Sequence, residues 1–377
     1  MFSSNRKISV RQARRLMILD LFGISSLLLP GLLAKTAGTD GIFCIAAAVL
    51  PALGYLWLLE KVMDRTEGDY YAYLKRVCGS IFADILMMFY LFFFLLLAAF
   101  GVYQLTGLIR AWLLPEGSFD LICFLLLAVA AYAAVRGMEV RARIYEILFW
   151  ILGIPLLLML ILAARGVNVD YWTPVATASF SGFSGGTLTV FAFFLPLFFI
   201  QFLKPWCVRP ERLPGSAGWA VVITAILIGA IYLILLGTFQ VKTIEVLKRP
   251  VITLMSMVKL PGEFFARLDA FMTAIWFFSL FALINTGVFY SGHVLKELFH
   301  EKRTNYGLLA VLILEFGGDR WFYVYPRAEE AFATYIKCVA MPVLVLLPVL
   351  LIFLGRLRDR RAGKTVRPQG GEQNETE

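Results

Sequence analysis

The sequence has little charge and few of the side chains that usually carry catalysis. Of its 377 residues, 16% are charged and two are histidines. It contains no H-E-x-x-H motif and no clustered pair of carboxylates. We therefore expect that the protein is not an enzyme, and we expect no cofactor and no metal site.

The five cysteines also lack the spacing of a redox or metal-binding motif. None belongs to a C-x-x-C pair, and three of them, Cys44, Cys123 and Cys338, lie in apolar runs. We expect all five cysteines to be reduced and to behave as small buried residues.

Apolar residues, in contrast, are abundant. They make up 60% of the chain, against about 45–50% in soluble proteins. They form runs of about 17–25 residues, which is the length that crosses a bilayer. The sequence therefore predicts an all-α integral membrane protein with ten spanning helices in one bundle. The predicted spans are roughly 14–34, 41–61, 83–107, 119–135, 144–164, 186–206, 216–238, 264–291, 305–323 and 333–355.

Lysine and arginine residues orient this bundle in the cytoplasmic membrane. With the N-terminus inside, every cytoplasmic segment carries at least three of them, as the positive-inside rule requires. The net charge of +9 then reflects topology, and we expect no nucleic-acid partner. We predict one transmembrane domain over residues 1–357 with both termini cytoplasmic. Residues 358–377 are polar and lack a hydrophobic period, so we expect a disordered tail.

The first span is interrupted by the stretch FGISSLLLPG at 22–31. Pro30 removes a backbone donor and Gly23 weakens the turn before it. At bilayer depth, irregular backbone is tolerated where it faces protein or a water-filled cavity. The stretch therefore predicts a discontinuous helix that holds a small polar ligand. The alternative is close helix packing through the small residues.

The sixth span carries a matching interruption. The stretch SGFSGGTLTVFAFFLPLFFIQFLKPW at 181–206 has a Gly/Ser-rich start and Pro196 near its middle. Transporter folds built from inverted repeats place their broken helices at corresponding positions. We therefore predict a LeuT-like five-plus-five inverted repeat in which helices one and six are discontinuous. Repeat one spans about 12–165 and repeat two about 186–357.

Three stretches resemble the spore germination permease family, which comprises the B subunits of endospore germinant receptors. They are KISVRQ at 7–12, FGISSLLLPGLLAKTAGTDG at 22–41 and RPVITLMSMVKLPGEFFARLDAFMTAIW at 249–276. The resemblance covers roughly residues 6–358. It implies the fold of the amino acid, polyamine and organocation transporters, with an amino-acid-sized ligand between helices one, three, six and eight. It also implies assembly with an A subunit and a lipoprotein C subunit in the spore inner membrane.

Candidate ligand-binding residues follow from these four helices. Helix N-terminal amides attract a carboxylate, which favours the break at 23–26. Thr286 and Tyr290 are four residues apart and share a face of helix eight, where an interhelical hydrogen bond is the alternative role. The full candidate set is Gly23, Ile24, Ser25, Ser26, Tyr103, Phe194, Pro196, Leu197, Thr286 and Tyr290.

Asp20 is a candidate for a proton or ammonium site, because it lies about two turns into helix one and three residues before Gly23. It can equally pair with Arg14 or Arg15 near the inner interface. These two roles remain open from the sequence.

The ninth span departs from the family pattern. Its apolar run, YGLLAVLILEF at 306–316, has eleven residues, or about 16 Å of helix against a core of about 30 Å. Either the helix continues through Gly317 and Gly318 to Tyr325, or it is truncated.

Two functions fit these expectations. The leading one is a germinant-receptor subunit that binds a small nutrient, an amino acid, and signals to its partner subunits. The alternative is a stand-alone secondary transporter of amino acids. The two share one binding pocket and differ in whether anything crosses the membrane.

Overall fold

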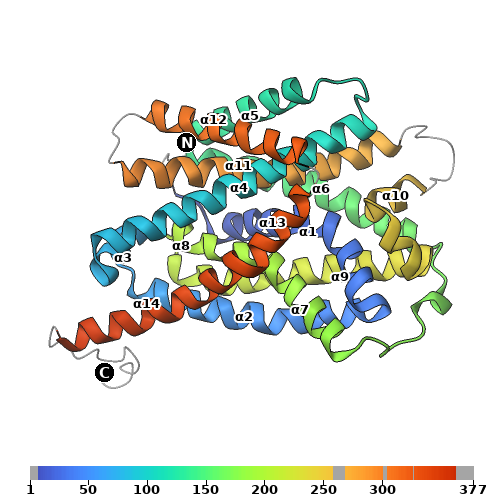
Figure 1. Cartoon of the computed structure of the whole chain (residues 1–377), viewed down its shortest axis with the longest axis horizontal. Coiled ribbons are helices and arrows are strands. Elements are labelled where there is room, and N and C mark those ends of the chain that lie inside the picture. The colour runs from blue at the N-terminus through green and yellow to red at the C-terminus, as the bar shows by residue number, and fades with distance from the viewer. Residues whose placement is uncertain (1–6, 258–267, 300–303, 326, 362–377) are drawn as a thin grey trace, which may run out of the picture.

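The computed structural model describes residues 7–257, 268–299, 304–325 and 327–361. Over these residues the chain is a bundle of helices (Figure 1), and each of the ten predicted spans coincides with a helical segment, except that residues 264–267 of the eighth span lie outside the described residues. Seven segments are long and apolar enough to cross a membrane, and one of them, 10–65, joins the first two helices. The protein is therefore an integral membrane protein, as the sequence predicts.

The first half of the bundle contains five long helices. Four of them extend beyond the predicted spans, whereas α5 has the predicted bounds 119–135. Their bounds are α1 Val10–Ala37, α2 Gly41–Arg65, α4 Ser80–Trp112, α5 Phe119–Val135 and α6 Gly137–Ala164. The short turn η1 Gly38–Asp40 joins α1 to α2, and the short helix α3 Tyr70–Cys78 lies between α2 and α4.

The second half has more interruptions than the first. It begins with η2 Val169–Trp172, α7 Phe180–Phe194, η3 Leu195–Phe198, α8 Phe199–Leu203, η4 Lys204–Trp206 and η5 Pro210–Arg212. It continues with α9 Leu213–Val246, α10 Pro250–Met257, α11 Leu268–Leu298 and α12 Thr304–Val324. It ends with α13 Ala328–Tyr335, the π-helical turn η6 Ile336–Ala340 and α14 Met341–Arg361.

Helix α1 lies in the centre of the bundle. It contacts α6, α7, α9 and α11, while α4 lies along α11 (Figure 1). Its N-terminus is fixed by a capping box, in which Ser9 Oγ accepts from Gln12 N and Gln12 Oε1 accepts from Ser9 N. The residue before it, Ile8, pairs as a short parallel bridge with Cys207. The start of the chain is thus tied to the segment that follows α8.

The prediction of a discontinuous first helix is wrong. Helix α1 is helical throughout Val10–Ala37 and contains Pro30 without an interruption. The prediction for the sixth span is confirmed, since α7 ends at Phe194 and the chain passes through η3 before α8 begins at Phe199. The interruptions are therefore not symmetric between the two halves.

The ninth span is not truncated. Helix α12 continues through Gly317 and Gly318 to Val324. A Cβ atom at Gly318 would lie 2.9 Å from Ala99 Cβ of α4, so a glycine there allows the two helices to approach closely. The pair of glycines thus marks helix packing at Gly318 and does not end the helix.

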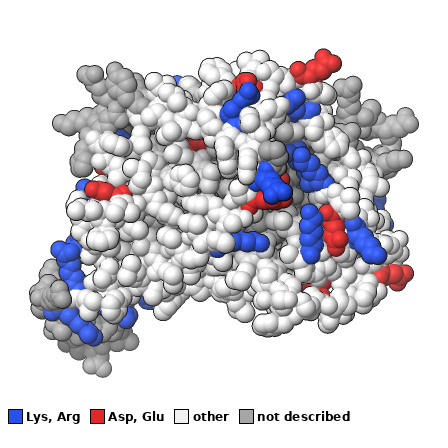
Figure 2. Space-filling model, in the orientation of Figure 1, with Lys and Arg blue, Asp and Glu red and all other residues white. Residues whose placement is uncertain are grey.

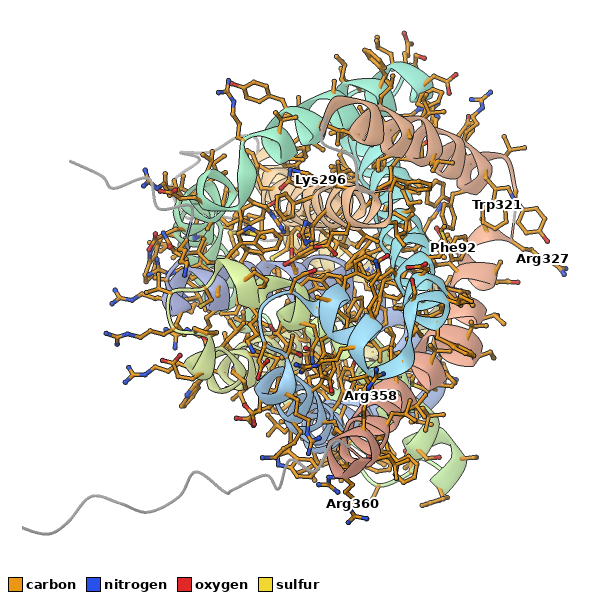
Figure 3. All side chains as sticks on the ribbon, turned by 90° about the vertical axis from the view of Figure 1, so that its left-hand side faces the viewer. Phe92, Lys296, Trp321, Arg327, Arg358 and Arg360 are labelled. Carbon is orange, nitrogen blue, oxygen red and sulfur yellow. The ribbon has the colours of Figure 1, made fainter. Side chains whose placement is uncertain are left out.

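Two smaller expectations need correction. All five cysteines are free, as predicted, but Cys338 is exposed on the bundle surface and Cys78 is half-buried. Helix α14 extends to Arg361, past the predicted start of the tail at 358, and residues 362–377 lie outside the described part of the chain. Figure 3 shows Arg360 at this end of α14, pointing away from the bundle.

Candidate functional site

A cavity of about 440 Å³ opens between α1, α4, the broken helix α7–η3, α11 and α13. Its wall is mainly apolar and aromatic, and Thr189 and Ser25 contribute hydroxyl groups. This size and lining are typical of a small-molecule pocket. The apolar lining comprises Leu21, Ile24, Leu27, Leu28, Gly31, Leu32, Phe93, Leu97, Phe100, Ala192, Phe193, Pro196, Val246, Leu247, Pro250, Leu283, Phe332, Ala333 and Ile336.

Four of the residues proposed from the sequence line this cavity, namely Asp20, Ile24, Ser25 and Pro196. The other seven do not belong to its wall. These are Gly23, Ser26, Tyr103, Phe194, Leu197, Thr286 and Tyr290. The ligand-binding role of Ile24, Ser25 and Pro196 stays a prediction, as does the proton or ammonium site at Asp20. For the other seven the structure gives a different environment.

Gly23 and Ser26 lie at the contact between α1 and α11. A Cβ atom at Gly23 would come within 2.8 Å of the Ser279 carbonyl oxygen. The indole Nε1 of Trp276 donates to Ser26 Oγ at 3.1 Å. At these two positions the packing alternative explains the sequence, and the uninterrupted helix offers no N-terminal amides to a ligand.

The hydroxyl groups of Ser25 and Thr189 face the cavity from opposite helices. Ser25 Oγ donates to the carbonyl oxygens of Leu21 and Phe22 in its own helix. Thr189 Oγ1 likewise donates to Gly185 O at 2.8 Å. Because each hydroxyl has one proton and that proton is already used, each presents its remaining lone pair as an acceptor. This part of the wall therefore favours a ligand group that donates hydrogen bonds.

The break in the sixth span forms one side of the cavity. Pro196 is an early residue of η3, a position where its missing N–H costs little. The helix stops at Phe194 and restarts at Phe199, so the α-helical hydrogen-bond pattern is interrupted beside the cavity. Phe194 and Leu197 are buried outside the cavity wall.

A buried polar cluster lies next to the cavity, where Asp20 of α1 meets α6 and α11. Thr286 Oγ1 donates to Asp20 Oδ1 at 2.5 Å. Arg141 Nη2 lies 3.7 Å from Asp20 Oδ2 and also donates to Thr286 Oγ1. All three side chains are buried. Asp20 is therefore neutralised by a guanidinium group that cannot lose its proton, and the predicted partners Arg14 and Arg15 are wrong.

Arg15 instead pairs with Glu146 of α6. The charge pattern counts Arg141, with Arg136 and Arg143, among the basic residues of the cytoplasmic segment between the fourth and fifth predicted spans, yet its side chain is 1% exposed. Its guanidinium lies over the rings of Tyr145, Phe289 and Tyr290 at 5.2–5.6 Å from their centroids. In a sequence, an arginine near the end of a spanning helix normally indicates the cytoplasmic side of the membrane. The sequence pattern alone therefore could not place Arg141 in the interior.

The two remaining candidates pack against other aromatic rings. Tyr290 stacks on Phe94 with centroids 5.1 Å apart. Tyr103 stacks on Phe322 with centroids 5.8 Å apart. Tyr290 thus supports the Arg141 cluster, and Tyr103 helps to join α4 to α12.

Charged residues surround the rim of the cavity. The rim contains Lys35, Glu245, Lys248, Glu329 and Lys337. Figure 2 shows charged side chains gathered on the side of the molecule where α9 and α10 lie, while most of the remaining face is uncharged. Lys35 comes from the last turn of α1, Glu245 and Lys248 from the segment after the kink at Gln240 of α9, and Glu329 and Lys337 from α13 and η6.

A hydrogen-bond chain crosses this rim between α4, the α9–α10 link and α13. Gln104 Nε2 donates to Glu329 Oε1 at 3.2 Å, and Arg249 Nη2 donates to Gln104 Oε1 at 3.3 Å. Burial lowers the pKa of Arg249, whereas Glu329 acts in the opposite direction. The chain connects three elements that border the cavity.

The bundle and its cavity define a protein with a transporter fold. The structure is similar to that of Mhp1, a nucleobase-cation-symport-1 family transporter in a closed conformation with bromovinylhydantoin bound. The TM-score is 0.68 at 13% sequence identity, and the match covers 94% of this chain and 80% of that chain. It shows that the fold is LeuT-like, as the sequence predicts.

Sequence comparison then gives the family. Residues 7–316 match the family model described as "Spore germination protein", and the chain belongs to this family. It is 23% identical to spore germination protein B2 of Bacillus subtilis (strain 168) over 316 residues, which is 83% of this chain and 86% of the relative. It is 22% identical to spore germination protein YndE of the same organism, over 96% of this chain and 99% of the relative.

Proposed function

We propose that this chain is the membrane subunit of a spore germinant receptor. It binds a small nutrient, an amino acid, in the cavity between α1 and η3, and passes the binding event to A-type and C-type partner subunits. The observation that carries the proposal is the cavity itself, which adjoins the helix break in a member of the spore germination family.

The polar groups of the cavity suit the two ends of an amino acid. Ser25 and Thr189 offer acceptor lone pairs to the ammonium group, as argued above. Three lysines at the rim, Lys35, Lys248 and Lys337, offer positive charge to the carboxylate. The aromatic and aliphatic wall between them holds the side chain and limits its size. This orientation is opposite to the sequence prediction, which assigned the carboxylate to residues 23–26.

The fixed charge on Arg141 favours a receptor over an ion-coupled transporter. Asp20 is the only acidic residue of α1, and it lines the cavity together with Ser25. In an ion-coupled transporter, a cation or proton that binds at such a residue would move together with the ligand. Arg141 already neutralises Asp20 and cannot leave with the ligand. A receptor needs binding and a conformational response, and neither requires an ion to cross the membrane.

The proposal places both termini in the cytoplasm, with the bundle in the spore inner membrane. Lysine and arginine support this orientation: even without the buried Arg141, the segment between α5 and α6 carries Arg136, and Arg143 follows within the first turns of α6. The α14 end carries Arg356, Arg358 and Arg360. The partner subunits contact the chain within or beside this membrane.

Nutrient-triggered germination tests the proposal. The gene is expressed with its A-type and C-type partners in a spore-forming host that lacks its own receptor for the same amino acid, and loss of spore refractility is followed. Thr189→Val keeps the side-chain shape and removes the cavity hydroxyl, so the amino acid response should be lost or need a higher concentration.

The matched control is Thr224→Val. Thr224 is also buried, lies outside the cavity wall, and its hydroxyl finds no hydrogen-bond partner among the described residues. It should therefore germinate as the wild type does. Uptake of the amino acid into proteoliposomes containing this chain alone, with no germination response in spores, would favour the transporter alternative.

A further inference from the structure

A second cluster of ligating side chains lies away from the cavity, where the start of α3 meets the end of α11. Asp69, His293 and Glu297 each offer one potential ligand atom, and these atoms lie within 4.8 Å of one another. In the sequence Asp69 is far from the other two, so no spacing motif reveals the cluster. Figure 3 labels Lys296, which lies on the same turn of α11 and marks its place.

The two residues of α11 share one helical face. His293 and Glu297 are four residues apart, and Nε2 of His293 lies 2.9 Å from Oε1 of Glu297. The second oxygen of Glu297, Oε2, is buried and has no hydrogen-bond partner among the residues that the structure describes. A buried carboxylate oxygen without a donor is costly, which indicates that something else satisfies it.

Asp69 is turned toward this pair. It occupies the N-cap position of α3, yet its side chain makes no capping hydrogen bond, although capping is the usual role of an aspartate there. Two carboxylates that face each other need a cation or a proton between them.

The ring of His293 is held in place from its other side. Trp206 contacts it edge to face, with ring centroids 4.7 Å apart. Trp206 in turn belongs to the segment that binds the start of the chain, because its carbonyl oxygen accepts from Ile8 N at 2.7 Å. The imidazole is therefore positioned by packing that is independent of the two acids.

We propose that Asp69, His293 and Glu297 form a binding site for a divalent transition-metal ion, with zinc as the best match. One imidazole nitrogen and two carboxylate oxygens are ligands that zinc accepts, whereas calcium and magnesium prefer oxygen alone. Zinc ligands lie about 2.0–2.2 Å from the ion, so small side-chain rotations bring the three atoms to bonding distance. The bound ion fastens the start of α3 to the end of α11. This inference does not rest on the proposed germinant function.

Zinc binding to the purified full-length protein tests the site. Protein freed of metal with a chelator is dialysed against increasing Zn²⁺, and bound zinc is measured by mass spectrometry. The wild type should bind about one ion per chain. Asp69→Asn, His293→Gln and Glu297→Gln should each weaken binding by at least roughly tenfold, the lower limit seen even for partners of metal ligands.

Two control variants separate this site from other zinc-binding groups. Glu67→Gln removes an exposed acid of the same loop, which pairs with Arg76, and Cys338→Ser removes the exposed thiol. Both should bind zinc as the wild type does. Melting temperatures measured without metal show whether each variant is folded.

The visible absorption of bound Co²⁺ gives an independent readout, since loss of a nitrogen ligand in His293→Gln should change the spectrum of a folded protein. The proposal is overturned if the wild type shows no saturable binding, if all three ligand variants retain it, or if Cys338→Ser abolishes it.

Discussion

The first helices of the two halves, α1 and α7–η3–α8, have similar sequences but different backbones. Both combine glycine and serine with a proline, at Pro30 and Pro196. Helix α1 stays helical past Pro30, whereas α7 ends just before η3, which contains Pro196. Proline removes one hydrogen bond wherever it lies, but the surroundings decide whether the helix breaks there.

The surroundings of the two helices differ in their polar anchors. Helix α1 is held on several sides, by the Asp20 cluster with α6 and α11 and by the close contacts of Gly23 and Ser26 with α11. In α7, Gly185 has no neighbouring atom within 4 Å of an added Cβ. Gly182 and Gly186 of the same helix nevertheless lie as close to Thr36 and Cys44 as Gly23 does to Ser279. The two helices therefore differ most clearly in the buried polar anchor, which α1 has through Asp20.

The largest expected effect concerns the buried anchor of α1. Arg141→Met leaves Asp20 buried without its counter-charge, and we expect a loss of about 3–5 kcal/mol in the free energy of unfolding. Unfolding in denaturant with the protein in detergent measures it. Asp20→Asn in the same chain should restore most of the loss, because the unpaired charge is then removed.

Arg143→Met is the matched control for this prediction. Arg143 lies two residues away, and its half-exposed side chain pairs with Glu139 in the same helix. Exposed pairs of this kind contribute about 0.3–0.5 kcal/mol. Equal losses in Arg141→Met and Arg143→Met would contradict an anchoring role for the buried cluster.

Glycine substitutions compare the packing of the two helices directly. Gly23→Ala places a methyl group 2.8 Å from the Ser279 carbonyl, and overpacking of this kind costs about 1–3 kcal/mol. Gly185→Ala meets no atom within 4 Å and should stabilise α7 by up to about 1 kcal/mol through helix propensity. Opposite changes in melting temperature support the comparison, and a matching loss in both variants argues against it.

The connection between the two helices depends on Asp40. This carboxylate accepts hydrogen bonds from the backbone N–H groups of Ala176, Thr177 and Ala178 at 2.6–2.7 Å, and so joins the turn after α1 to the segment before α7. Burial acts to raise its pKa, but these hydrogen bonds prevail and lower it below 3.8. The stabilisation is therefore present above about pH 4 and is lost as the pH falls through the lowered pKa.

Asp40→Asn measures this contribution. At neutral pH we expect a loss of about 1.5 kcal/mol, because one hydrogen bond to a charged group is worth at least that much. The difference in the free energy of unfolding between Asp40→Asn and the wild type should become smaller as the solution is acidified below pH 4. A difference that stays constant down to pH 2 would show that the Asp40 charge is not the cause.

The smallest effect belongs to the hydrogen bond between α11 and α1. Ser26→Ala removes the acceptor of the Trp276 indole N–H, and leaving this buried donor unpaired should cost about 1 kcal/mol. Ser184→Ala in α7 removes a hydroxyl that bonds within its own helix at 3.3 Å, and it should change the melting temperature much less. Equal changes in melting temperature in Ser26→Ala and Ser184→Ala would mean that the hydrogen bond between Trp276 and Ser26 contributes no additional stability.

The sequence predicted the spans and the family well because both depend on long patterns. Apolar runs of about twenty residues define spanning helices without reference to their neighbours. Glycine, serine and proline within one span correctly predicted the break at Pro196, but the same combination around Pro30 led to a wrong prediction for α1. The helix ends were underestimated because polar first turns, such as the Ser9–Gln12 capping box of α1, extend beyond the apolar run.

Features that depend on contacts between distant residues could not be predicted. The continuity of α1 follows from its packing against α11, and the burial of Arg141 follows from a partner on α1. The cavity wall includes Thr189 and Phe93, whose side chains carry no local signal of their position. The kink at Gln240 and the π-helical turn η6 help to form the rim of the cavity, and no pattern in the sequence predicts either of them.

The assignment of the cavity between α1 and η3 as the ligand site is tested most directly by ligand binding. The measurement is the shift in melting temperature of the purified full-length protein with each common amino acid, for the wild type, Ala192→Leu and Gly185→Ala. Ala192 lines the cavity and its replacement by leucine fills part of it, whereas Gly185 is on the same helix outside the wall. A bound ligand at about one hundred times its Kd stabilises by about 2.7 kcal/mol.

We predict that at least one amino acid stabilises the wild type and Gly185→Ala, and that Ala192→Leu, although folded, loses the shift. Equal stabilisation of all three proteins, or of none of them, would contradict the assignment of this cavity as the ligand site.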